Sequence, residues 1–419
     1  MKPIRPVFAG LDIGSTKVSI TVGIPSFAAG ASTQNEIEIV GVGTAPNTGI
    51  RQGVVVNIEA TSESISRARE EAELMSGYKI HEVWVGVNGT HIKSFDSRGM
   101  VAIRNKEVTA QDVQRVIEAA KAVAVPTDRT VLHVLPREFK VDGQDGILDP
   151  VGMNGIRLEA SVHIVTCSAT AVANNLKCIE KAGLKVAGLV LDQLAASMSV
   201  ISEDEKNLGV CVVDMGGGCS NMIYFVNGSV AHTSVIPVGG SHFTHDIAVG
   251  LRTPQIAAED LKKKYGCAIA TLVPEEEVMD VEGVGGRKPR TVLRREIAEV
   301  IEPRAEETMQ LIQNDLRMSG LLPLMGSGIV LTGGACQLEG ILEMGEFVFD
   351  VPVRRSSPGK VGGLVEVVKS PAYATGVGLI LYGWNQKKHL LSHFHSEDAI
   401  GDSLQSWTTK IKGLLDHLF

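Results

Sequence analysis

The sequence reads Val7-Phe-Ala-Gly-Leu-Asp12-Ile-Gly14-Ser15-Thr16-Lys17 near its start and Val210-Cys-Val-Val-Asp214-Met-Gly216-Gly217-Gly218-Cys219-Ser220-Asn221 in its second half. In each stretch an apolar run ends at an aspartate and turns through glycine. Because glycine has no Cβ, the backbone N–H groups of such a turn can approach an anion. The aspartates would face the same anion, where a phosphate-bound Mg²⁺ can use them directly or through water. Two such turns predict two similar lobes that close on one polyphosphate, with Asp12 and Asp214 as candidate metal-binding residues.

Composition limits the class of protein. A chain of 419 residues with 44% hydrophobic content is long enough to form several packed domains. Its aromatic content of 4% and its net charge of −8 argue against nucleic acid as a partner. The six cysteines form no CxxC pair and no zinc-site spacing, so we expect reduced thiols in a cytoplasmic protein. We find no signal-peptide pattern and no apolar stretch of about 18 residues, and we expect no membrane span.

The middle of the chain alternates between strand and helix patterns. Val162–Cys167 is strand-like, the helix that follows stops at Gly183, and Leu184–Leu191 is a second apolar strand. This alternation predicts an α/β sheet. The preceding region, residues 84–163, holds a helix at Thr109–Ala122 and short strands but no phosphate motif. We therefore expect an inserted small α+β domain there.

These patterns predict a division of the chain into nine consecutive parts. They are lobe 1 with the first glycine turn (1–83), the inserted domain (84–163), a return to lobe 1 (164–201), lobe 2 with the second turn (202–247), an outer subdomain of lobe 2 (248–310), lobe 2 with a third glycine turn (311–355), a closing helix of lobe 1 (356–384), a polar linker (385–402) and a C-terminal amphipathic helix (403–419).

The third glycine turn follows an apolar strand at Ile329–Leu331. Its residues Gly333, Gly334 and Ala335 can lie against a ribose, an adenine and an α-phosphate, although a strand-to-helix turn often needs glycine for packing alone. Together with the two other turns, the nucleotide interpretation is favoured. We add Gly239 and Gly240 to the candidate cofactor-binding residues.

Three further features carry a functional and a plain interpretation. Lys17, after Gly14, Ser15 and Thr16, can reach a β- or γ-phosphate, or it is a solvated hairpin lysine; its neighbours favour the phosphate contact. Glu259, Lys262 and Lys263 lie on one side of a helix that opens at Pro254, where they can reach a ribose or a purine edge or simply face solvent. Gln193 can position a water for attack on a γ-phosphate or have no such role, and the sequence does not separate the two.

These motifs resemble the actin/heat-shock-protein/sugar-kinase ATPase superfamily. The first turn is similar to its phosphate-1 loop, Asp214–Gly218 to its phosphate-2 loop and Ile329–Ala335 to its adenosine loop. Leu184–Ile201 and Pro371–Gly383 are similar to its two connecting segments. Within the superfamily the chain resembles the bacterial FtsA family of cell-division proteins over essentially its whole length. The stretches that carry this resemblance are Gly10–Lys17, Val131–Pro136, Asp149–Met153, Lys181–Val186, Tyr265–Ala268 and Glu299–Arg304.

The resemblance implies an actin-like, two-lobed fold that binds ATP with Mg²⁺, forms filaments and ties the tubulin-like protein FtsZ to the inner face of the cell membrane at the division septum. It implies that residues 248–310 receive the FtsZ C-terminal tail, where Arg294 and Arg295 offer cationic contacts. It also implies that the inserted domain serves self-assembly and the recruitment of later division proteins. One departure concerns catalysis: Cys219 and Asn221 stand where many superfamily members carry a threonine and an acid. We therefore expect weak or no ATP hydrolysis.

The last 17 residues have the pattern of an amphipathic helix that binds a membrane surface. One helical stripe, with Phe419 beside it, carries Leu404, Trp407, Ile411, Leu414, Leu415 and Leu418. Burial of these side chains contributes roughly 10–20 kcal/mol, and the ordering of so short a helix offsets much of it. A single tail thus anchors weakly and reversibly, so that many linked copies are needed. The alternative is that this face docks on the protein's own core, and the polar stretch 385–402 favours a tether instead.

Two other functions share the predicted clamp. An actin-like scaffold for pilus assembly would lack the lipid-binding helix and bind a different peptide. A small-molecule kinase would need a substrate base across the cleft, and the sequence offers no candidate with supporting context.

Overall fold

Two β-sheets of the same topology form the centre of the chain, which we describe from a computed structural model for residues 6–26 and 36–397. In each sheet three consecutive antiparallel strands are followed, on the other side of the first strand, by two parallel strands. The order is β3-β2-β1-β6-β11 in the first sheet and β14-β13-β12-β17-β18 in the second. The duplication expected from the two glycine turns is therefore present in the strand order itself.

The first sheet and its helices form lobe 1. Its strands are β1 (Phe8–Ile13), β2 (Lys17–Pro25), β3 (Ile37–Pro46), β6 (Glu82–Val87), β11 (Lys185–Leu191) and the short edge strand β19 (Gly362–Gly363), with a small hairpin of β4 (Ile50–Arg51) and β5 (Val54–Val55). Its helices are α1 (Ile58–Ser76), α3 (Ala169–Lys181), α4 (Asp192–Val200), α10 (Val365–Val368), η4 (Pro371–Tyr373) and the first part of α11 (Ala374–Glu397). Side chains of β1, β2, β6, α1 and α3 share one hydrophobic core.

The second sheet carries a separate core. Its strands are β12 (Val210–Met215), β13 (Ser220–Val226), β14 (Ser229–Ile236), β17 (Ile329–Thr332) and β18 (Val353–Arg355), and a hairpin of β15 (Val278–Val281) and β16 (Arg290–Leu293) lies further out. The helices are α5 (Glu203–Leu208), α6 (Gly240–Gly250), α7 (Gln255–Tyr265), η1 (Ala270–Leu272), α8 (Arg294–Met318), η2 (Leu322–Leu324), η3 (Gly334–Gln337) and α9 (Ile341–Phe349). Buried residues of α6, α8 and α9 pack with the sheet in lobe 2.

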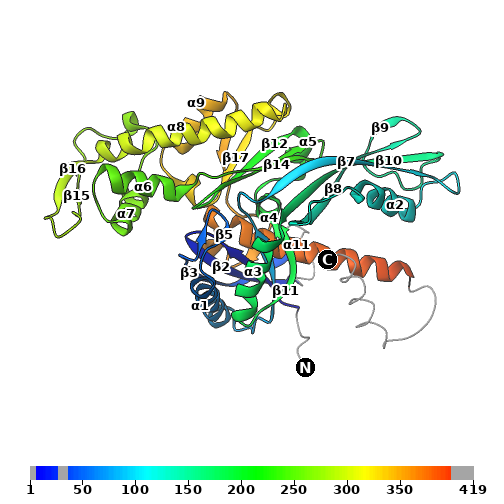
Figure 1. Ribbon diagram of the computed structural model, residues 1–419, viewed down its shortest axis with the longest axis horizontal. Helices are drawn as coiled ribbons and strands as arrows, with labels where there is room; N and C mark the ends of the chain where they lie inside the picture. The colour runs from blue at the N-terminus through cyan, green and yellow to red at the C-terminus, as the bar shows by residue number, and fades with distance from the viewer. Residues whose placement is uncertain (1–5, 27–35, 398–419) are drawn as a thin grey trace. The chain divides into compact units, whose positions relative to one another are not determined.

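The inserted domain has a third core of its own. It is a four-stranded antiparallel sheet in the order β7 (Lys93–Ala102), β10 (Arg157–Ser168), β8 (Arg129–Val141) and β9 (Gln144–Ile147), covered by α2 (Ala110–Lys121). Figure 1 draws these elements together in cyan and green beside β14 of lobe 2. The Thr109–Asp112 capping box at the start of α2 is formed as expected, with both hydrogen bonds in place.

Three expected boundaries differ from the structure. Strand β6, which starts at residue 82, pairs with β1 in the sheet of lobe 1, so the inserted domain does not begin at residue 84. Strand β10 continues past residue 163 to Ser168, because its pairing with β8 extends that far. Helix α11 continues to Glu397, so the expected linker from residue 385 is helical up to that point.

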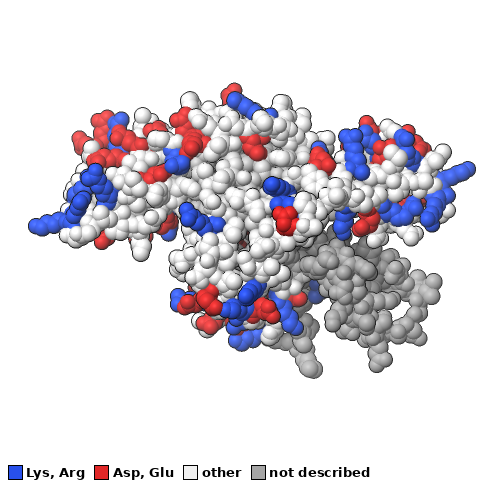
Figure 2. All heavy atoms as spheres, in the orientation of Figure 1, with Lys and Arg blue, Asp and Glu red and all other residues white. Residues whose placement is uncertain are grey.

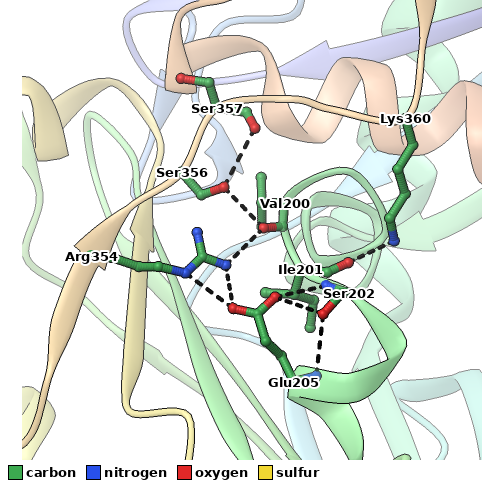
Figure 3. A network of polar contacts seen from close by, with 8 residues as sticks. All are labelled: Val200, Ile201, Ser202, Glu205, Arg354, Ser356, Ser357 and Lys360. Carbon is green, nitrogen blue, oxygen red and sulfur yellow. Dashed lines mark hydrogen bonds and ion pairs between the residues drawn. The ribbon is translucent and has the colours of Figure 1, made fainter.

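The crossing from lobe 1 to lobe 2 runs through α4 and α5 and is fixed by polar contacts at the end of α4 (Figure 3). The last carbonyl groups of a helix have no partner within the helix. Here the Val200 carbonyl accepts hydrogen bonds from Ser356 Oγ at 2.9 Å and from Arg354 at 3.2 Å, and the Ile201 carbonyl accepts one from Lys360 Nζ at 2.6 Å. Arg354 also pairs with Glu205 at 2.5 Å. The end of α4 is therefore held by β18 and the segment that follows it.

The chain divides by its contacts into two units, Met1–Leu381 and Tyr382–Phe419. Within residues 6–26 and 36–397, no helix is long and apolar enough to cross a membrane. The amphipathic stripe expected at residues 404–419 lies outside the described residues.

Candidate functional site

The two glycine turns have the same backbone geometry. Gly14 N–H donates to the carbonyl of Lys17 at 2.9 Å, and Gly216 N–H donates to the carbonyl of Cys219 at 2.9 Å. In the paired strands, Asp12 faces Ser19 across one hairpin, and Asp214 faces Asn221 across the other. Each lobe therefore presents a turn of main-chain amides and an aspartate in equivalent positions.

The glycine turn of lobe 1 and the glycine turn of lobe 2 lie close together where the two lobes face each other. A methyl group at Gly217 would lie 2.6 Å from Thr16 Cγ2, and one at Gly218 would lie 2.5 Å from Ser15 Oγ. Such distances are too short for a real side chain, so this approach requires glycine. The third turn joins them because Gly333, at φ 84°, lies against Asp214 Oδ1.

A pocket that encloses about 640 Å³, part of it open to solvent, lies where the three turns meet. Of the residues predicted from sequence, the structure brings eleven to its wall: Asp12, Gly14, Ser15, Thr16, Lys17, Asp214, Gly216, Gly217, Gly218, Gly333 and Gly334. Seven further lining residues were not predicted as site residues: Asn88, Asp192, Cys219, Asn221, Pro371, Ala372 and Thr375.

Burial makes the charged form of the pocket carboxylates unfavourable, a cost that a bound cation would offset. Burial, with a smaller effect from the neighbouring charge of Asp12, raises the pKa of Asp214 to about 6. Burial also raises the pKa of Asp12, against the opposing charge of Lys17, and burial lowers the pKa of Lys17. A divalent cation between Asp12 and Asp214 would relieve both the desolvation and the repulsion. Asp12 and Asp214 therefore fit a metal that is bound together with a polyanion.

No group of three His, Cys, Asp or Glu side chains within the described ranges is arranged to hold a metal ion alone. The pocket thus offers carboxylates to a metal ion and main-chain amides to an anion. Asn221 Oδ1 is also buried and has no hydrogen-bond partner among the described protein atoms. This arrangement fits Mg²⁺ that arrives with phosphate and keeps most of its water ligands.

Asp192 is a pocket residue that the sequence interpretation missed. Asn88 Nδ2 donates a hydrogen bond to its Oδ2, and its Oδ1 has no partner among the described protein atoms. Burial, followed by the charge of Asp12, raises the pKa of Asp192. The sequence signal was available, because the apolar run Leu184–Leu191 ends at this aspartate as the other two runs end at theirs.

Gln193 does not occupy the place expected for it. Its side chain is fully buried, it does not line the pocket, and neither of its amide atoms has a hydrogen-bond partner among the described protein atoms. Successive residues at the start of a helix point in directions about 100° apart. The pocket is therefore reached by Asp192, and the water-positioning role expected for Gln193 is not supported.

Lys17 lies inside the pocket wall and is not a solvated hairpin lysine. Its Nζ donates to the Ala372 carbonyl at 2.9 Å and stands 4.1 Å from the centre of the Tyr373 ring. The ammonium is thus held next to Asp12 and close to the turns. This position fits a contact with a terminal phosphate.

The other predicted cofactor residues stand behind the wall and not on it. Gly240 N–H donates to the Gly216 carbonyl at 2.9 Å, so Gly239 and Gly240 support the second turn from the start of α6. Lys262 Nζ donates to the Gly240 carbonyl at 2.9 Å and pairs with Glu259 at 2.7 Å. Three remaining residues were also predicted to touch the cofactor and do not line the pocket: Ala335, Glu259 and the exposed Lys263.

The two arginines predicted to contact a partner differ in their surroundings. Arg294 is mostly buried and donates to the Tyr265 carbonyl at 2.9 Å, to Glu277 at 2.9 Å and to Glu339. Its donors are therefore engaged within lobe 2, which corrects the expectation that it faces a partner. Arg295 is partly exposed and forms ion pairs at 3.5 Å with Glu275 and 3.2 Å with Glu299.

Two sheets of one topology that meet through glycine turns, each preceded by an aspartate, define an actin-like ATPase fold. Family models described as "Cell division protein FtsA" and "SHS2 domain inserted in FTSA" match residues 211–378 and 89–166. The cell division protein FtsA of Pseudomonas aeruginosa is 47% identical over 386 residues, which cover 92% of this chain and 91% of that protein. The chain therefore belongs to the FtsA family of cell-division proteins.

Other relatives agree with this assignment, and solved structures of other proteins share the fold. FtsA of Escherichia coli K12 is 39% identical over 98% of both chains, and FtsA of Bacillus subtilis is 39% identical over 90% of this chain and 83% of that protein. The PilM–PilN type IV pilus biogenesis complex has a TM-score of 0.64 at 17% identity, covering 90% of this chain and 99% of that one. MreB5 of Spiroplasma citri, solved bound to ADP, has a TM-score of 0.53 at 14% identity, covering 92% and 98%. These structures confirm the actin-like fold, and the family model over residues 89–166 confirms the inserted domain.

Proposed function

We propose that this chain binds ATP with Mg²⁺ in the pocket between its lobes. The observation that carries the proposal is the approach of Ser15 and Thr16 to Gly217 and Gly218, which places amides of both lobes around one space. The main-chain amides of the two turns would hold the phosphates, and Lys17 would contact a terminal phosphate. Asp12 and Asp214 would hold Mg²⁺ through its water ligands. The third turn, at Gly333 and Gly334, would lie against the nucleoside.

The bound Mg²⁺ would supply charge neutralisation of the phosphates and of the two aspartates. Hydrolysis depends on a group that orients a water, and Asp192 is the candidate in this chain, because it is a carboxylate that lines the pocket. Cys219 also lines the wall, where many members of the superfamily place a threonine hydroxyl, and burial raises the pKa of its thiol to about 12. The thiol is therefore protonated at neutral pH, and a protonated thiol forms only weak hydrogen bonds to a water molecule on the metal ion. We therefore propose tight binding and slow hydrolysis.

We further propose that the chain is a filament-forming adaptor that ties FtsZ filaments to the inner face of the cell membrane at the septum. The family assignment supports this role, and the apolar stripe from Leu404 to Leu418 with Phe419 supplies a reversible membrane anchor. The outer subdomain, residues 248–310, would bind the FtsZ tail with Arg295 at its surface. The inserted domain would take part in self-association and in the recruitment of later division proteins.

The kind of partner follows from the surface. On the face drawn in Figure 2, Lys and Arg side chains are interspersed with Asp and Glu over both lobes and the inserted domain. This face offers no continuous basic stripe to a nucleic acid, and we propose protein and lipid partners. A pilus scaffold shares the fold, but the 39–47% identity to FtsA proteins over most of the chain favours the division role.

Calorimetry of the purified full-length chain with Mg-ATP tests the first proposal. We expect one binding site per chain and a weaker signal without Mg²⁺. Absence of binding heat together with no Mg-ATP-dependent rise in Tm would refute it. Capture of synthetic peptides tests the adaptor role. We expect this chain to capture an FtsZ tail peptide and not a pilus-protein peptide of similar charge, and the reverse preference would favour the scaffold.

A further inference from the structure

A histidine of the inserted domain contacts the residue next to a pocket carboxylate. His133 lies in β8 and is buried, and its Nε2 accepts a hydrogen bond from the backbone N–H of Leu191 at 3.0 Å. Leu191 ends β11, and the next residue is Asp192, which lines the pocket. The inserted domain therefore reaches the wall of the nucleotide site by one hydrogen bond.

This hydrogen bond has a structural cause. β11 is the edge strand of the sheet in lobe 1, so N–H groups on its outer side have no strand partner. A buried N–H without an acceptor is strongly unfavourable. Burial lowers the pKa of His133 to about 4, so the ring is neutral at neutral pH and its Nε2 is available as an acceptor. His133 thus satisfies the last N–H of the strand that leads into Asp192.

The apolar packing around His133 continues along α4. Leu135, two residues further on β8, packs against a cluster that includes Ala196 and Val200 of α4. A second cluster joins Val165 of the inserted domain to Leu191. The inserted domain is therefore seated on the start and on the side of the helix that carries Asp192.

The hydrogen-bond partner of the Asp192 side chain is also tied to β8. Asn88, which donates to Asp192, begins the segment that enters the inserted domain. Further along this segment, the His91 carbonyl accepts a hydrogen bond from Arg129, the first residue of β8, at 2.8 Å. The hydrogen bond to Asp192 and the one to the neighbouring Leu191 thus both lead to β8.

We propose that His133 is a positioning residue for Asp192, so that the inserted domain and the nucleotide pocket are energetically coupled. The inference rests on the proposed nucleotide site. Because such coupling is reciprocal, a partner that shifts the inserted domain would change the affinity of the pocket for Mg-ATP, and Mg-ATP would change the seating of the inserted domain.

The test uses the full-length chain and three variants. His133→Leu removes the acceptor and keeps an apolar side chain, and His133→Gln restores an acceptor at a similar reach. His163→Leu is the matched control, because His163 is a buried histidine of the same domain whose partners, Asp96 and Thr233, do not line the pocket. Calorimetry gives Mg-ATP affinity, thermal unfolding verifies that each variant is folded, and hydrogen exchange reports on β8 with and without Mg-ATP.

We expect Mg-ATP to slow exchange both in the turn after β1 and in β8 of the unmodified chain. In His133→Leu the slowing should persist in the turn and disappear from β8, with Mg-ATP affinity reduced at least about fivefold, the lower end of usual site-to-site coupling. His133→Gln should recover most of both effects, and His163→Leu should keep the original affinity.

The inference is overturned if Mg-ATP does not change hydrogen exchange in β8 of the unmodified chain while calorimetry and the turn after β1 both report bound Mg-ATP. That outcome would leave the nucleotide site intact. Equal losses in His133→Leu and His163→Leu would overturn it as well, because they would indicate general loosening of the inserted domain. If the unmodified chain binds no Mg-ATP in calorimetry, the proposed function itself fails and the inference falls with it. The exchange measurement on the unmodified chain does not depend on the folding of any variant.

Discussion

Ser15 and Gly218 belong to opposite lobes and touch each other: a methyl group placed on Gly218 would stand 2.5 Å from Ser15 Oγ. The same methyl would also lie 3.2 Å from the backbone nitrogen of Gln52. Because both neighbours are on lobe 1, the closed position of the lobes depends on the absence of a side chain at residue 218.

Gly218→Ala should push the two turns apart and weaken Mg-ATP binding by at least about tenfold, or about 1.4 kcal/mol. Calorimetry measures the loss. Gly359→Ala is the matched control, because a methyl there would be 3.7 Å from its nearest neighbour. In the double variant Ser15→Gly/Gly218→Ala the loss should be smaller than the sum of the single effects. Additive losses would contradict a direct contact between the two residues.

Asp214→Asn should stabilise the protein in the absence of nucleotide and Mg²⁺, and should weaken Mg-ATP binding. The pKa of Asp214 is raised to about 6 from 3.8, so the folded protein holds a proton that the unfolded chain releases. Stability therefore falls as pH rises from about 4 through 6, by up to about 3 kcal/mol, and the asparagine variant avoids this loss. Urea unfolding at pH 5 and pH 7.5 should show a larger advantage of the variant at pH 7.5. An advantage that shrinks as pH rises would contradict the assignment.

Asp192 and Gln193 are neighbours with different expected effects. Asp192→Ala should weaken Mg-ATP binding about fivefold or more and reduce any hydrolysis, because a pocket carboxylate is lost. Gln193→Met should leave both within about twofold and raise the unfolding free energy by up to about 1 kcal/mol, since a buried amide without partners is replaced by an apolar side chain of similar size. Calorimetry, phosphate release and urea unfolding give the three quantities. A loss of phosphate release in Gln193→Met with unchanged Mg-ATP affinity would restore the water-positioning role that the sequence left open.

Arg294 and Arg295 offer a comparison of an internal and an external arginine. Arg294→Gln should lower the unfolding free energy by about 1–3 kcal/mol, because Glu277 and Glu339 lose a shared partner. Arg295→Glu should leave stability nearly unchanged and weaken capture of an FtsZ tail peptide about tenfold. Fluorescence anisotropy with the labelled peptide measures the second effect. Equal peptide affinity in Arg295→Glu and the unmodified chain would remove Arg295 from the proposed surface.

Deletion of residues 403–419 should release the protein from anionic lipid vesicles while Mg-ATP affinity stays the same. Sedimentation with vesicles measures the first effect and calorimetry the second. Trp407→Glu should act in the same direction, since a charge enters the apolar stripe, and Lys412→Gln is a milder control on the polar side. Sedimentation of the truncated chain to the same extent as the full chain would show that the anchor lies elsewhere.

Local sequence determined the parts of this protein that depend on neighbouring residues. Apolar runs that end in aspartate and glycine predicted the turns after β1 and β12, and helix signals predicted α2 with its Thr109 cap. The α/β class followed from the order of these parts, and the family was indicated by the resemblance of stretches such as Gly10–Lys17 and Val131–Pro136. Backbone conformation within a few residues is governed by glycine, capping groups and the spacing of apolar side chains, all of which can be read along the chain.

The tertiary structure alone decided which of these parts meet. It replaced Gln193 by Asp192 at the pocket, enclosed Arg294 between Glu277 and Glu339, and brought His133 to Leu191. Each of these outcomes joins residues that are distant in sequence or depends on the direction of a single side chain. Such contacts are set by how the lobes and the inserted domain exclude water from their shared surfaces, and that is a property of the packed chain as a whole.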